Sequence, residues 1–103
     1  MTRARLPNRR FAETFEFSIC GLRYTCTVGR FADGAIAELF LTNHKSNSAA
    51  DTAARDAAIA FSFAVQHGAD AHAIRRAFCR DSRGQASGPL GRALDILLVE
   101  ERP

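Results

Sequence analysis

Apolar and polar residues alternate along two stretches near the start of the chain. Each stretch collects its large side chains on one face: Phe15, Phe17 and Ile19 within residues 14–19, and Leu22, Tyr24, Cys26 and Val28 within residues 22–28. A period of two is typical of half-buried strands. Glycine-containing turns at Cys20-Gly21 and Asp33-Gly34 separate them from each other and from a third strand at 35–42. We therefore predict an antiparallel three-stranded meander.

The pattern changes to helical spacing after Ser48. We predict a long helix over 49–67 that begins at a Ser48 cap with Asp51 three residues on, and ends before Gly68. Residues 57–65 of this helix carry no charge, which predicts that it is covered on at least two sides. On that basis Ile59, Phe61, Phe63 and Val65 are all expected to fill gaps in the core. Two shorter helices are predicted over 71–80 and from Pro89 onward.

The order of these elements gives the fold class α+β: a three-stranded antiparallel β-meander followed by two or three helices packed on one face (βββααα). We expect residues 1–10 to form a basic flexible arm and residues 11–100 a single domain, which suits a chain of 103 residues. No apolar run approaches the roughly 20 residues of a membrane span. No apolar segment follows the basic start, so the sequence predicts no secretory signal and a cytoplasmic location.

The chain has three cysteines, Cys20, Cys26 and Cys79. An odd number without C-x-x-C spacing argues against a disulfide framework and against a zinc site built by one chain. We expect all three to be small buried hydrophobic residues. The sequence predicts no metal and no cofactor.

Net charge is +3 and unevenly distributed. A secondary basic patch is predicted from residues of the arm and of the second half of the chain: Arg9, Arg10, Arg76, Arg80 and Arg83. Weak nucleic-acid binding through such residues would collapse with salt. The polar face of the predicted sheet supplies no aromatic platform for bases, so the sequence does not favour this alternative.

The turn at 43–48 is the best candidate site. It brings a cation, hydroxyls and amides to a helix start, where unpaired N–H groups and the helix dipole attract anions. A nucleotide or phosphate could bind there, and the candidate residues are Asn43, His44, Lys45, Ser46 and Ser48. An ordinary polar connection with a helix cap explains the same residues. The turn is not a P-loop, because it lacks G-x-x-x-x-G-K-[ST].

The sequence assigns no catalytic residue. His44 is the only plausible general base, but no nucleophile or acid can be assigned to it. His44, His67 and His72 lack metal-ligand spacing. A small enzyme of nucleotide metabolism therefore stays an alternative that depends on His44 alone.

The third predicted strand has two unlike faces. If Ala37, Leu39 and Leu41 face the helices, Ile36 and Phe40 are exposed on the open face of the sheet. An exposed apolar patch on a small domain suggests a partner. We expect a homodimer or docking onto a larger protein.

Several short motifs, taken in order, resemble a known module. They are Leu6-Pro7-Asn8-Arg9-Arg10, Asp33-Gly34, Ala37-Glu38-Leu39-Phe40-Leu41, His44-Lys45, Ala57-Ala58-Ile59-Ala60-Phe61-Ser62, Gln66-His67-Gly68 and Ser87-Gly88-Pro89-Leu90-Gly91. Together they resemble the C-terminal accessory region of cobalamin-dependent (class II) ribonucleotide reductases, a module that also occurs alone as the TSCPD domain. The resemblance runs from about Leu6 to Leu98.

The resemblance implies an accessory or regulatory module that is not catalytic by itself and whose partner is the reductase. The chain departs from the family where the name-giving T-S-C-P-D motif falls, because residues 86–90 read Ala-Ser-Gly-Pro-Leu without cysteine. The zinc suggested for that family is therefore not carried over. A chain of this length also lacks room for the barrel that holds the reductase chemistry.

Overall fold

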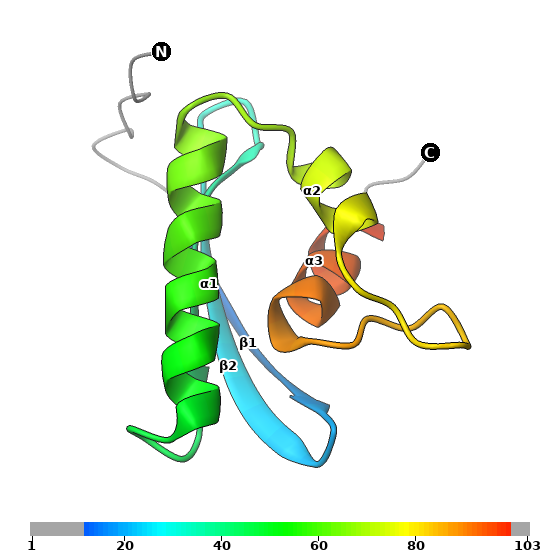
Figure 1. Cartoon of the computed structure of the whole chain (residues 1–103). Helices are drawn as coiled ribbons and strands as arrows, with labels where there is room; N and C mark the ends of the chain where they lie inside the picture. The colour runs from blue at the N-terminus through cyan, green and yellow to red at the C-terminus, as the bar shows by residue number, and fades with distance from the viewer. Residues whose placement is uncertain (1–11, 100–103) are drawn as a thin grey trace.

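Three strands followed by three helices make up the fold (Figure 1). In the computed structural model, which describes residues 12–99, the strands are β1 (Ala12–Ile19), β2 (Leu22–Arg30) and β3 (Ile36–Asn43), and the helices are α1 (Ala49–Gln66), α2 (Ala71–Ala77) and α3 (Pro89–Val99). The strands form one antiparallel sheet in the order β1-β2-β3. The α+β class and the βββααα order are confirmed. The predicted arm, residues 1–10, lies outside the described part.

The core lies between one face of the sheet and the helices. Alternation in the strands turns one set of side chains toward α1, which packs mainly on β3, and toward α3, which reaches β1. The set contributed by the strands includes Phe17, Ile19, Tyr24, Cys26, Val28, Leu39 and Leu41, and the helices add Ala54, Ala58, Phe61, Val65, Leu90, Ala93, Leu94, Leu97 and Leu98. In the described part of the chain, no helix is both long and apolar enough to cross a membrane.

A β-bulge at the start of β3 corrects one prediction. Gly29 pairs with Glu38, but the next residue, Arg30, pairs with Ile36, so Ala37 is the extra residue. The shift places Ile36 on the core side, where it is only 5% exposed. The expected exposure of Ile36 is therefore wrong, whereas that of Phe40, which lies beyond the bulge, is confirmed at 50%.

Helix α1 is covered less completely than its composition suggests. Phe61 and Val65 are buried as predicted, but Ile59 is 48% and Phe63 is 50% exposed. The helix packs on β3 on one side and contacts α3 on another. Ile59 and Phe63 share one side of the helix and are each about half exposed, so the prediction that both fill the core is wrong.

Polar side chains of α1 cover the backbone of β3, which is an edge strand. Ser62 bonds to the backbone of Leu39, and the Gln66 amide donates to the Ala37 carbonyl at 2.8 Å. Both side chains are buried. An edge strand otherwise presents unpaired backbone groups to other chains. Helix α1 thus closes this edge.

The cysteines do not share one environment. Cys26 is buried in the core, but Cys20 and Cys79 are exposed, which corrects the prediction that all three are buried. Cys20 lies in the β1–β2 turn with a φ of 53°, and Cys79 follows α2, which ends at Ala77.

Candidate functional site

The turn between β3 and α1 is held by local hydrogen bonds. The Asn43 Oδ1 accepts from the Lys45 N–H at 2.8 Å, and the Ser48 hydroxyl donates to the Lys45 carbonyl at 2.7 Å. Ser48 also caps α1 by accepting from the Asp51 N–H at 3.1 Å, so the predicted cap is confirmed. Of the candidate residues, His44, Lys45 and Ser46 are exposed.

The Asp51 carboxylate occupies the start of α1. It accepts from the backbone N–H groups of Asn43 at 2.9 Å and Asn47 at 3.2 Å, and from Arg55 Nε at 3.0 Å. The hydrogen bond from Asn43 is the main cause that lowers the pKa of Asp51, with Asn47 and Arg55 adding to it against the effect of burial. This side chain is buried, not exposed as its pairing with Arg55 suggests. A carboxylate of the protein therefore sits where an added anion would be attracted.

From the sequence, Asp51 is assigned only a part in the cap and a surface pair with Arg55 four residues on. Its distance of three residues from Ser48 is the signal that could have assigned it a larger role. Because Asp51 already accepts from the N–H groups of Asn43 and Asn47, an added anion at this turn would instead contact Lys45 and Ser46. The Asn43 Nδ2, which has no partner among the described residues, is buried and so offers a ligand nothing.

His44 belongs to a polar cluster on the open face of the sheet. Its Nε2 lies 3.0 Å from Thr25 Oγ1 and 3.3 Å from Glu16 Oε1, and Arg23 lies 3.6 Å from the same Glu16 oxygen. A catalytic relay uses both ring nitrogens, one for the nucleophile and one for the carboxylate. Here both contacts involve one nitrogen, so the geometry gives no support to His44 as a general base.

Part of the predicted basic patch is used inside the fold. Arg80 forms two hydrogen bonds to Asp95 at 2.8 and 2.9 Å, and Arg75 Nε reaches the same carboxylate at 2.6 Å. The Arg80 hydrogen bond, followed by that of Arg75, holds the pKa of Asp95 down at about 2 in spite of its burial. Arg75 is buried where it makes this contact, although its place in a run of arginines suggests an outward-facing side chain.

The remaining members of the patch differ in exposure and in whether the structure describes them. Arg76 and Arg83 are exposed, whereas Arg9 and Arg10 lie outside the described residues. Arg80 is turned toward Asp95 and the Gly84 carbonyl. Of the predicted patch, Arg76 and Arg83 are thus the exposed members within the described residues.

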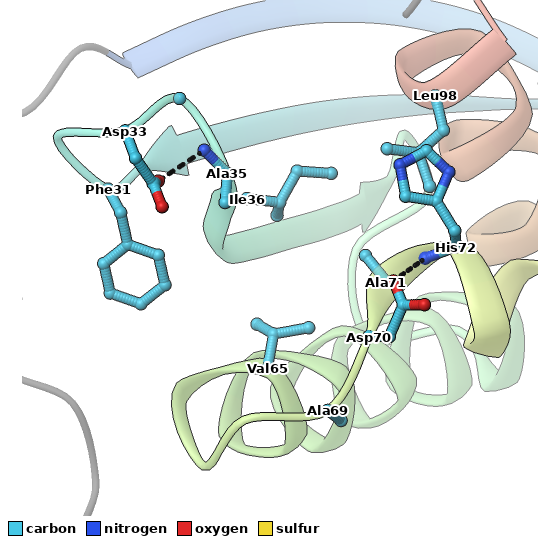
Figure 2. A pocket seen from close by; sticks show the side chains of 11 residues that line it. Phe31, Asp33, Ala35, Ile36, Val65, Ala69, Asp70, Ala71, His72 and Leu98 are labelled. Carbon is cyan, nitrogen blue, oxygen red and sulfur yellow. Dashed lines mark hydrogen bonds between the residues drawn. The ribbon is translucent and has the colours of Figure 1, made fainter. Parts of the chain in front are cut away.

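A cavity of about 550 Å³ lies beside the β2–β3 turn and the start of α2. Figure 2 shows Phe31, Ile36 and Val65 around it, with Asp33 and Asp70 contributing carboxylates. Asp33 accepts from the Ala35 N–H at 2.9 Å and Asp70 caps α2 through the His72 N–H at 3.0 Å. Among the described residues that line this cavity, none is a lysine or arginine, so this part of the lining offers a phosphate no cation.

An apolar patch, defined by Phe40, Ile59 and Phe63, lies where β3 meets the outer side of α1. These side chains surround a hollow of about 120 Å³ that Glu38 also lines. Each is about half exposed, between 48% and 50%. Sequence reasoning finds Phe40 but misses its two helical neighbours, because the uncharged run at 57–65 looks fully buried.

The described residues contain no group of three or more histidine, cysteine or acidic side chains arranged to hold a metal ion. The three cysteines are free thiols. Cys26 lies in the core, where burial, aided by Glu13, raises the pKa of its thiol to about 12.

Comparison with known proteins gives one informative relationship. The chain is similar to part of a reductase. Over 66 residues, 64% of the chain, it is 36% identical to a vitamin B12-dependent ribonucleotide reductase of Agrobacterium fabrum (strain C58 / ATCC 33970). The match spans only 5% of that enzyme's length. No family model and no solved structure matches the chain, so its assignment to the TSCPD domain stays a prediction.

Proposed function

We propose that this chain is an accessory module, related to the C-terminal region of the vitamin B12-dependent ribonucleotide reductases, that acts by contact with the reductase and catalyses no reaction alone. The observation that carries this proposal is the sequence match to such an enzyme. The two chains are 36% identical over 66 residues, a segment that makes up 5% of the enzyme. A module of this size corresponds to a small part of a large protein, and contact with that protein is its simplest role.

The apolar patch supports a role in protein contact. Phe40, Ile59 and Phe63 lie on two adjacent elements and surround one hollow. Contiguous exposed apolar surface is uncommon on small soluble domains and marks interaction sites. Fully burying one such side chain contributes about 1.5–3 kcal/mol, so covering the exposed halves of three would favour a complex.

The proposal is tested by measuring the affinity of the chain for the vitamin B12-dependent ribonucleotide reductase of its own organism. The variant Phe40→Ser/Phe63→Ser should weaken binding at least about tenfold, as loss of central aromatic anchors does. Leu22→Ser is the matched control, because Leu22 is 42% exposed but lies at the start of β2, away from the patch. Equal affinity of both variants, or no binding by the native chain, would contradict the proposal.

Nucleotide or phosphate binding at the 43–48 turn is a second prediction with less support. It depends on the exposed Lys45 and Ser46, and the Asp51 carboxylate opposes it. Calorimetric titration with ATP and dATP tests it. Saturable heat that Lys45→Ala abolishes would support the site, and absence of heat would return the turn to a structural role.

A further inference from the structure

A groove between α1 and α3 has the features of a ligand site. None of the residues that line it belongs to the apolar patch. Its volume of about 330 Å³ is within the lower range of small-molecule pockets. Ala50, Ala53 and Ala57 of α1 line one side, and the first residues of α3 line the other. Alanines leave room between helices that larger residues would fill. The lining is mainly apolar, and its polar groups are therefore decisive.

The first polar group is the hydroxyl of Tyr24, which lies on β2 beneath the helices. Tyr24 is only 3% exposed, lines the groove and has its ring stacked on Phe17. Its hydroxyl forms no hydrogen bond with another described residue. A buried tyrosine usually has such a partner, and the Tyr24 hydroxyl is not one of the fully buried atoms that lack one, so it can be reached from outside the core. The hydroxyl is thus a donor that a ligand in the groove would satisfy.

The second polar feature is the start of α3, an 11-residue helix. Gly88 precedes the helix and Pro89 is its first residue. Neither has a side chain that can cap the helix. Among the described residues, none accepts from the backbone N–H groups of Leu90 and Gly91, which both line the groove. Such N–H groups at the positive end of a helix bind anions.

The charges around this helix start also favour an anion. The first turn of α3 contains no acidic residue. Arg92 follows directly, and its Nε is buried without a partner among the described residues. A cation near the positive end of a helix is unfavourable, and a bound anion would offset it. By contrast, α1 already holds Asp51 at the corresponding place.

We propose that this groove binds a small carboxylic acid with an apolar body. The body packs against the alanines of α1, and the carboxylate accepts hydrogen bonds from the N–H groups of Leu90 and Gly91 and from the Tyr24 hydroxyl. The groove size limits the ligand to a short chain or a single ring. This inference is independent of the proposed contact with the reductase.

Calorimetric titration of the full chain with 4-phenylbutyrate tests the site, with 4-phenylbutanol as the uncharged counterpart. The acid should bind saturably and the alcohol at least about tenfold more weakly, a difference of about 1.4 kcal/mol. Tyr24→Phe, which removes one hydroxyl at constant shape, should weaken binding of the acid by about threefold to tenfold. Equal binding of acid and alcohol, or no saturable binding of the acid, would overturn the proposal.

Two further measurements locate the site. Ala53→Leu fills the groove from an exposed position and should abolish binding, whereas Ala60→Leu, at an exposed position of the same helix outside the groove, should not. Cys79 lines the groove and Cys20 does not. Saturating 4-phenylbutyrate should therefore slow alkylation of Cys79 by iodoacetamide and leave Cys20 unchanged. Unaltered alkylation of Cys79 would contradict a ligand in this groove.

Discussion

The Ser62 hydroxyl in α1 bonds to both backbone groups of Leu39 in β3. It accepts from the Leu39 N–H at 2.9 Å, and its proton is shared between the Leu39 carbonyl at 3.0 Å and the Ala58 carbonyl at 2.8 Å. The edge of β3 is thereby closed by the helix. A partner at the apolar patch must contact side chains, because it cannot add a strand there.

Removing the Ser62 hydroxyl should destabilise the domain. Ser62→Ala leaves the buried backbone groups of Leu39 without this partner, which should lower the free energy of unfolding by about 1–3 kcal/mol. Urea denaturation measures the change. Ser82→Ala, in an exposed loop, is the control and should have almost no effect. Equal effects of the two variants would show that the edge contact contributes little.

Two phenylalanines of α1 should differ sharply in their contribution to stability. Phe61 is 3% and Phe63 is 50% exposed, although they lie two residues apart. Phe61→Ala should cost about 3–5 kcal/mol through transfer and cavity terms, and Phe63→Ala under about 1 kcal/mol. Thermal or urea unfolding compares them. A large loss in Phe63→Ala would mean that the patch is part of the core.

Asp95 should make stability depend on pH in the acid range. Its folded-state pKa of about 2 lies below the ordinary 3.8, so its contribution is present above about pH 4 and is lost as the pH falls toward 2. Asp95→Asn should therefore lower the free energy of unfolding at pH 6, by about 2 kcal/mol. The gap between native and variant should close near pH 2.

Urea denaturation across this pH range checks the prediction for Asp95. Asp56→Asn, an exposed change on α1 without an ion pair to a described residue, is the control. A deficit in Asp95→Asn that stays constant down to pH 2 would contradict the role of the Arg75 and Arg80 contacts.

The three cysteines should differ in their reactivity toward alkylating reagents. Cys20 and Cys79 are exposed, whereas Cys26 is buried with a thiol pKa raised to about 12. Iodoacetamide should label Cys20 and Cys79 in the native chain at pH 8, and Cys26 only in denaturant, because the thiolate is the nucleophile. Mass spectrometry identifies the sites. Rapid native labelling of Cys26 would place it outside the core.

The fold was predictable because its signals are local. Period-two alternation, the turn at Asp33-Gly34 and the Ser48 cap each determine a short piece of backbone. The wrong predictions concern side chains whose exposure is determined by packing between elements that are distant in the sequence. The bulge that buries Ile36 depends on pairing with Arg30, and the exposure of Ile59 and Phe63 depends on where α3 lies. A single sequence contains no local signal for either.

The candidate site was less predictable for the same reason. The sequence places Lys45 and Ser48 at a helix start, but only the fold shows that Asp51 already occupies the N–H groups of Asn43 and Asn47. The contact of His44 with Glu16 and Thr25 likewise joins residues on three strands or their ends. Such contacts follow from strand register, which alternation alone does not determine.

Sedimentation velocity tests the central claim most directly. The full chain is followed alone at high concentration and then mixed with the vitamin B12-dependent ribonucleotide reductase of its organism. The proposed function predicts a monomer alone and co-sedimentation with the reductase, reduced by Phe40→Ser/Phe63→Ser. A chain that sediments as a free monomer in the mixture, or that only dimerises with itself, would contradict it.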